Sequence, residues 1–231
     1  MIEIIPAIMP RSWEDLEGEV ARVAPFVGKV QIDVMDGKFV KNKSWPYMKG
    51  RAGDKFFKLL QVEEIGLPSW QDVDFEADMM IDKPEEEIEK WIAAGMARII
   101  VHVESTKKLS EIIKIFQLHN AHEVGIELGL ALNPDTSTDQ ILPFLEDIQF
   151  VQFMGIDRIG LQGQPFDEKV LDKIREFHNA HPEMVISVDG GVNFEDAHAL
   201  VEAGARHLVS GSAILESTDI AEAVERFKKI V

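Results

Sequence analysis

The residues best placed to do chemistry lie in the segment 29–37, where acidic side chains follow a run of apolar ones. Its apolar residues alternate with Gln31 and Asp33, which is typical of a β-strand, and Asp36 and Gly37 form a typical turn pair. A carboxylate on the inner face of a strand costs roughly several kcal/mol unless a metal, a ligand or hydrogen bonds satisfy it. Asp33 is therefore either a functional residue or the cap of a turn or helix.

Composition and charge exclude several classes of protein. The 231 residues carry a formal net charge of −17, which argues against a general nucleic-acid binder because Lys and Arg hold phosphate backbones. No apolar run approaches the ~18 residues of a membrane span. The N-terminus resembles a strand and lacks the basic region and cleavage site of a signal peptide. Without cysteine there are no disulfides and no thiolate chemistry. We expect a cytoplasmic protein with no nucleic-acid or membrane partner.

Positive charge gathers in one segment, which offers a local site for an anionic small molecule. The basic residues there are Lys38, Lys41, Lys43, Lys49, Arg51, Lys55 and Lys58, and Asp54 is the one acidic residue among them. A solvated loop explains the same composition equally well.

The strand that carries Asp33 is one of a series, because short β-rich runs alternate with amphipathic helical runs along the chain. Eight such pairs in 231 residues predict an α/β fold, a (β/α)8 TIM barrel, whose strand exits share one face and form the expected active site. We expect one domain over 1–231, an extended connection of about 38–53 after the second strand, and a helix over 137–145. Alternation alone leaves an open, doubly wound sheet as the alternative.

Short motifs at the expected strand exits form a specific set. They are Asp33-Val34-Met35-Asp36-Gly37, Val101-His102-Val103-Glu104, Leu130-Ala131-Leu132-Asn133-Pro134, Val188-Asp189-Gly190-Gly191 and Gly211-Ser212-Ala213-Ile214. Together they resemble the ribulose-phosphate 3-epimerases, which are barrels of the ribulose-phosphate-binding type, over essentially the whole chain. The resemblance implies proton exchange at C3 of a ketose phosphate through an enediolate. Asp33 and Asp189, on opposite faces of the substrate, would remove and return the proton.

The resemblance also implies a divalent metal and no organic cofactor. The family binds its metal with a His and an Asp on strand two, a His on strand three and an Asp on strand seven, and these positions hold Gln31, Asp33, Asp78 and Asp189 here. Both imidazoles are missing. Oxygen donors alone favour Mg²⁺ or Mn²⁺ over zinc. Without an ion the carboxylates would repel one another and raise at least one pKa, so either a hard ion binds or the site is remodelled.

Phosphate binding is the third implied property, through backbone N–H groups of glycine-rich turns. The substrate- and phosphate-binding positions are Met35, Gly163, Gly190, Gly191, Gly211 and Ser212. Alternatively, these glycines only satisfy tight strand-to-helix turns. The chain departs from the family at Ala7, where Ser is usual, and in the loop after strand six, which has one apparent extra residue.

We therefore expect a phosphosugar epimerase that binds a small sugar phosphate, with homo-oligomerisation left open. The alternative is a non-catalytic phosphate-binding barrel that has lost its metal. Related decarboxylases use an Asp-x-Lys-x-x-Asp run on strand three, but the run from Asp78 to Asp82 has no lysine at the required place. None of the seven histidines is assigned a role; His102 lies on the expected fourth strand.

Overall fold

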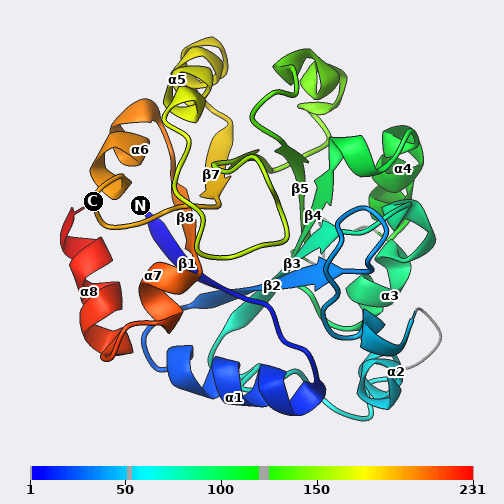
Figure 1. Cartoon of the computed structure of the whole chain (residues 1–231). Helices are drawn as coiled ribbons and strands as arrows, with labels where there is room; N and C mark the ends of the chain where they lie inside the picture. Colours follow the sequence, from blue (N-terminus) through cyan, green and yellow to red (C-terminus); the bar gives the residue numbers. More distant parts are fainter. Residues whose placement is uncertain (1, 51–53, 120–124, 231) are drawn as a thin grey trace.

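The computed structural model describes residues 2–50, 54–119 and 125–230. Its centre is a closed barrel of parallel strands in chain order (Figure 1). The strands are β1 (Glu3–Ile8), β2 (Lys29–Met35), β3 (Asp74–Met80), β4 (Arg98–His102), β5 (Glu127–Leu132), β6 (Phe150–Met154), β7 (Val185–Asp189) and β8 (His207–Ser210). Because β1 pairs with both β2 and β8, the predicted (β/α)8 barrel is confirmed and the open sheet is excluded.

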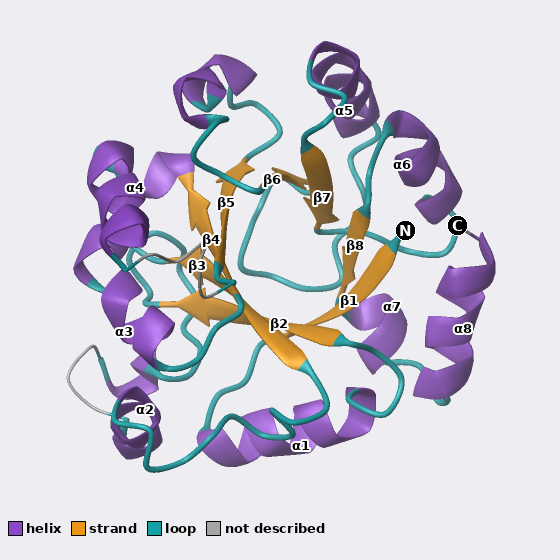
Figure 2. Ribbon diagram, turned by 180° about the vertical axis from the view of Figure 1, so that it is seen from behind, coloured by secondary structure: helices purple, strands orange, loops and turns teal. Residues whose placement is uncertain are grey.

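Helices surround the barrel on its outside (Figure 2). The α-helices are α1 (Trp13–Val23), α2 (Lys55–Gln61), α3 (Ile88–Ala93), α4 (Leu109–Leu118), α5 (Lys169–Ala180), α6 (Ala197–Ala203), α7 (Ser212–Leu215) and α8 (Ile220–Ile230). Short 3-10 helices are η1 (Tyr47–Lys49), η2 (Pro84–Glu86), η3 (Val103–Ser105), η4 (Thr138–Gln140) and η5 (Leu142–Phe144). None of the described helices is both long and apolar enough to cross a membrane.

Strand β2 shows why this sequence forms a barrel wall. Val30, Ile32 and Val34 are fully buried in the main core cluster, which also contains the apolar residues of the surrounding helices. Gln31 and Asp33 alternate with them and therefore face the barrel interior. The same period-two alternation places one polar layer inside the barrel at each end of the strands.

The connection between β5 and β6 differs from the prediction. A helix was expected over 137–145, but η4 and η5 occupy this stretch, and among residues 125–230 no α-helix separates the two strands. Pro143 lies inside the expected helix, where it has no N–H to donate and its ring clashes with the preceding turn. A continuous helix is therefore replaced by two short turns.

The long connection after β2 folds back over the barrel. Asp36 forms an isolated bridge with Lys43, and the Ser44 hydroxyl accepts a hydrogen bond from the Met35 N–H at 2.9 Å. The Phe39 ring lies 5.5 Å from the His102 ring, centroid to centroid. Of the predicted basic segment, Arg51 lies outside the described residues, as do positions 51–53 of the connection.

Charged side chains fill the N-terminal end of the barrel interior. The buried Arg98 side chain contacts three carboxylates: Glu3 at 2.7 Å, Glu76 at 3.4 Å, and Glu127. Burial raises the pKa of Glu76 to about 7 even though Arg98 opposes the shift. Burial and the nearby Arg98 charge lower the pKa of His207 to about 4.

Candidate functional site

The strand register brings the predicted acidic residues together at the C-terminal end of the barrel. Asp33 on β2 lies directly opposite Asp78 on β3, and Asp189 is the last residue of β7. One carboxylate oxygen from each of the three residues lies within 4.8 Å of the other two. All three side chains are buried, so the structure places a compact carboxylate cluster where the strands end.

Gln31 joins two of these carboxylates. Its Nε2 donates to Asp33 Oδ1 at 2.7 Å and to Asp189 Oδ2 at 2.9 Å, across the barrel from β2 to β7. In this orientation Gln31 offers hydrogens to the cluster, whereas the sequence predicted a neutral ligand or a substrate contact. The reversed amide would point Oε1 at two carboxylates, which would be repulsive. Gln31 thus occupies a family imidazole position but acts as a donor between two acids.

Asp78 has its own donors, which the sequence did not reveal. His102 Nε2 lies 2.9 Å from Asp78 Oδ1, and both side chains are fully buried. Gln152 Nε2 donates weakly to Asp78 Oδ2 at 3.4 Å, and the Ser187 hydroxyl donates to Gln152 Oε1 at 3.1 Å. A period-two reading of β4 and β6 places these residues on the inner face, but their contact with Asp78 depends on the register between strands.

The charges of the cluster follow from burial. Burial, then the charges of Asp189 and Asp78, raise the pKa of Asp33 well above its ordinary value. Burial and Asp78 raise the pKa of Asp189 to about 7, although the Gln31 hydrogen bond opposes this. Burial by itself would lower the pKa of His102, but the Asp78 carboxylate outweighs it and raises that pKa. Near neutral pH the cluster can therefore both accept and release a proton.

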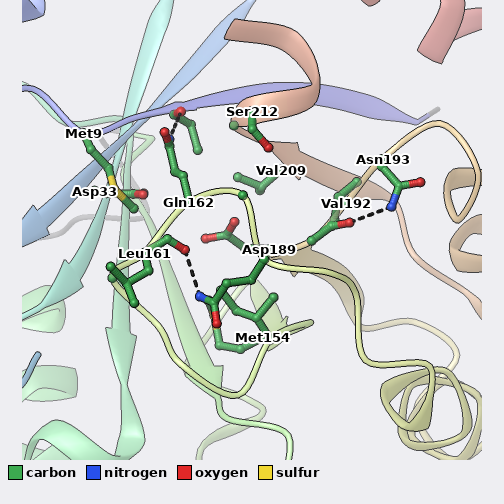
Figure 3. A pocket seen from close by; sticks show the side chains of 18 of the residues that line it. Met9, Asp33, Met154, Leu161, Gln162, Asp189, Val192, Asn193, Val209 and Ser212 are labelled. Atoms are coloured by element: carbon green, nitrogen blue, oxygen red, sulfur yellow. Dashed lines mark hydrogen bonds between the residues drawn. The ribbon is translucent and has the colours of Figure 1, made fainter. Parts of the chain in front are cut away.

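A cavity of about 310 Å³ opens beside the cluster (Figure 3). Asp33 and Asp189 both line it, whereas Gln31 and Asp78 lie deeper in the barrel. All five predicted phosphate-binding residues line the same cavity: Gly163, Gly190, Gly191, Gly211 and Ser212. Met35 does not line the cavity; it is buried beside it, packed with Val40 and Met80. Acids and glycine turns thus share one site large enough for a small sugar phosphate.

The two glycines after β7 are required by the backbone. Gly190 and Gly191 have φ values of +96° and +71°, in the left-handed region that favours glycine. A Cβ on Gly191 would lie 2.6 Å from backbone atoms of Phe166, and one on Gly190 would lie 2.7 Å from the Ile156 side chain. The positive φ values and the lack of room for a Cβ explain why these two positions hold glycine, with or without a bound phosphate.

The loop after β6 covers the cavity and crosses the barrel opening in Figure 1. Gln162 Nε2 donates to the Ala7 carbonyl at 3.0 Å, and Asn42 Nδ2 donates to the Gly160 carbonyl at 2.9 Å. The Ala7 backbone carbonyl of β1 and the Asn42 side chain from the connection after β2 therefore hold this loop at two points. Gln162 lines the cavity and was not among the predicted site residues.

The carboxylate cluster suits a hard divalent cation. Its nearest donor atoms are carboxylate oxygens from three strands, and no thiolate or free imidazole joins them within the described residues. Mg²⁺ and Mn²⁺ prefer such oxygen ligands, and His102 is already bonded to Asp78. The residues present thus fit a divalent ion, although not with the imidazole ligands of the family pattern.

Comparison with known proteins identifies relatives over nearly the whole chain. The model of the ribulose-phosphate 3 epimerase family matches residues 3–215. Ribulose-phosphate 3-epimerase from Bacillus subtilis is 31% identical, with 99% of each chain covered. The enzyme of the same name from Schizosaccharomyces pombe is 29% identical over 99% of this chain and 93% of its own.

Solved structures share the fold at lower identity. A 3-hexulose-6-phosphate synthase superposes with a TM-score of 0.67 at 21% identity, covering 100% of both chains. The 3-keto-L-gulonate-6-phosphate decarboxylase from Vibrio cholerae gives 0.70 at 15% identity, covering 100% of this chain and 98% of that chain. These likenesses describe the barrel alone. The family match and the relatives' identity decide the assignment: the chain belongs to the ribulose-phosphate 3-epimerase family.

Proposed function

We propose that this protein is a phosphosugar epimerase that exchanges the C3 proton of a ketose phosphate through an enediolate. Family membership supports the reaction class. The observation that carries the proposal is the pairing of Asp33 and Asp189, which share one hydrogen-bond donor and line one cavity. Inversion at carbon needs a group that removes the proton and another that returns it from the opposite face, and two carboxylates on the non-neighbouring strands β2 and β7 would meet this need.

Asp33 and Asp189 would share the proton transfers. In one direction, an ionised carboxylate takes the C3 proton and the electron pair moves into the enediolate. The other carboxyl, protonated at the start, then delivers its proton to the opposite face of C3. The raised pKa values of both groups support this division, because the pair can hold one proton near neutral pH.

The glycine turns would bind the phosphate. Gly163, Gly190, Gly191, Gly211 and Ser212 border the cavity, and neither Lys nor Arg lines it in the part of the chain that the structure describes. Backbone N–H groups, together with neutral side-chain donors such as the Ser212 hydroxyl, would therefore have to bind the phosphate. Met35, buried beside the cavity, would support its wall rather than contact the phosphate.

A divalent ion, Mg²⁺ or Mn²⁺, would complete the site. Asp33, Asp78 and Asp189 would hold it, and Gln31 would keep two of these carboxylates in place. Such an ion supplies positive charge for the enediolate oxygens, which is usually a large contribution to catalysis. The expected non-catalytic alternative is less favoured, because both proton-transfer acids and the cavity are present together.

The remaining expectations extend the proposal. Residues 1–231 would form one domain, since the barrel uses strands from residue 3 to residue 210. A cytoplasmic location would fit a chain without cysteine.

Deuterium incorporation tests the proposal. The protein is incubated in heavy water with a panel of pentulose and hexulose phosphates, with and without Mg²⁺ or Mn²⁺, and exchange at C3 is followed by NMR and mass spectrometry. We expect exchange with at least one ketose phosphate, none with its unphosphorylated sugar at equal concentration, and loss of exchange with one of its two C3 epimers in Asp33→Asn. If no ketose phosphate exchanges under any of these conditions, the enzyme proposal fails and the binding-module alternative replaces it.

A further inference from the structure

His102 is the buried histidine closest to the carboxylate cluster, and the proposed reaction does not use it. It ends β4 and is fully buried, with Nε2 2.9 Å from Asp78 Oδ1. Asp78 adds a third buried carboxyl group to the cluster, and a buried carboxyl group needs hydrogen-bond partners. Gln31 serves Asp33 and Asp189 in this way but is not bonded to Asp78.

The barrel register explains how His102 reaches Asp78. His102 pairs with Ala131 on β5, Ala131 with Gln152 on β6, and Gln152 with Ser187 on β7, so these four residues form one row on the inner face. Ala131 is the small member of this row. The His102 and Gln152 side chains on either side of it both extend to Asp78.

The other side of the imidazole faces a second carboxylate. His102 Nδ1 lies 3.9 Å from Glu104 Oε2, and Glu104 Oε1 accepts hydrogen bonds from the Asn133 N–H at 2.8 Å and from the Thr136 hydroxyl. The Phe39 ring packs against the imidazole. The ring therefore lies between two carboxylates and one aromatic face, and it is hydrogen-bonded to Asp78, whereas Nδ1 and Glu104 Oε2 have no hydrogen-bond partner among the described residues.

We propose that His102 is a positioning residue that holds the Asp78 carboxylate toward Asp33 and Asp189, so that the three acids can bind a divalent cation. The inference rests on the proposed function, because it assigns Asp78 as a ligand of that ion. Position 78 has no imidazole of its own, and the histidine of the neighbouring strand acts on the ion through Asp78. Hydrogen-bonded partners of metal ligands typically change metal affinity by about 10- to 100-fold when they are removed.

Mn²⁺ binding, measured by calorimetry and by electron paramagnetic resonance, tests the inference without any substrate. His102→Leu fills the position with an apolar side chain and removes the hydrogen-bond donor. His102→Gln keeps an N–H donor of similar reach. His207→Leu is the matched control, because it makes the same change at a buried histidine at the other end of the barrel. Asp78→Asn tests the ligand assignment itself.

We expect His102→Leu to weaken Mn²⁺ binding about 10- to 100-fold, His102→Gln to stay within about 3-fold of the wild type, and His207→Leu to bind normally. Unchanged binding in His102→Leu, with weakened binding in Asp78→Asn, would overturn the inference and leave the ion site in place. Equal losses in both His102 variants would also overturn it. If the wild type binds no Mn²⁺, or if Asp78→Asn binds normally, the inference fails as well, whereas C3 exchange still decides the proposed function.

A measurement on the wild-type protein covers the case in which His102→Leu does not fold. The ring nitrogens of His102 are assigned in ¹⁵N NMR spectra by difference from His102→Gln. We expect Nε2 to carry a proton both before and after Mg²⁺ is added, because it donates to Asp78. An unprotonated Nε2 would overturn the inference.

Discussion

The two ends of the barrel interior both contain buried charges, but they balance them differently. At the N-terminal end, the Arg98 guanidinium contacts Glu3, Glu76 and Glu127 directly. At the C-terminal end, three carboxylates cluster with an amide and an imidazole, and no Lys or Arg pairs with them among the described residues. The first arrangement contains its own cation. The second has excess negative charge beside a cavity, which is the condition for binding a cation and moving protons.

The largest expected difference between the ends is in catalysis. Asp33→Asn should lower kcat/KM by about 10²- to 10⁴-fold, the usual contribution of a general acid or base. Glu76→Gln makes the same carboxylate-to-amide change at the other end and should stay within about 3-fold. Steady-state kinetics on the ketose phosphate that exchanges best provides the measurement. A similar loss in both variants would remove the distinction between the two ends.

The stability of the fold should depend on the N-terminal end of the barrel more than on the C-terminal end. Arg98→Met leaves the buried Glu76 without its cation and should lower the free energy of unfolding by about 3–5 kcal/mol. Asp33→Asn removes a carboxylate whose pKa is raised by burial and by two neighbouring acids, and should be neutral or stabilising. Urea denaturation monitored by circular dichroism compares the two. Marked destabilisation by Asp33→Asn would show that the carboxylate cluster at the C-terminal end stabilises the fold.

Glu76 also predicts a pH dependence of stability. Its pKa is raised from 4.5 to about 7 in the folded state, so its contribution to stability is complete below pH 4.5 and is lost as the pH rises through 7. At about 1.4 kcal/mol per unit, the loss amounts to roughly 3.5 kcal/mol at most. Glu76→Gln should therefore lose less stability than the wild type between pH 5 and pH 8. Parallel curves for the two proteins would contradict this assignment.

Metal preference is the smallest expected change. The double variant Gln31→His and Asp78→His restores imidazoles at both family positions and should tighten zinc binding about 10-fold or more relative to Mn²⁺, because imidazole suits zinc. Competition between the two ions, followed by elemental analysis after dialysis, measures the shift. Unchanged preference would mean that these positions do not contact the ion.

The sequence was sufficient for the features that repeat along the chain. Period-two alternation identified the strand that carries Asp33 and placed Asp189 at a strand exit, and the closed barrel then brought both to one cavity. The expected helix over 137–145 was wrong because helical spacing of apolar residues was given more weight than the break at Pro143.

Contacts across the barrel could not be predicted from the alternation of residues along the chain. Gln31 bridges β2 and β7, which are not neighbours, so its two hydrogen bonds exist only once the barrel closes. The contact between His102 and Asp78 depends on a register of two strands whose sequences give no offset. The sequence therefore predicted which acids gather, whereas the donors that hold them needed the three-dimensional structure.

The central claim, that Asp33 and Asp189 act from opposite faces of one substrate, is tested most directly with separate epimers. Each C3 epimer of the exchanging ketose phosphate is incubated in heavy water with Asp33→Asn and with Asp189→Asn. The account predicts a crossed result, in which each variant exchanges the C3 proton of a different epimer and neither inverts it. If both variants retain exchange with the same epimer, or if either variant still inverts C3 at the wild-type rate, the two-base account is contradicted.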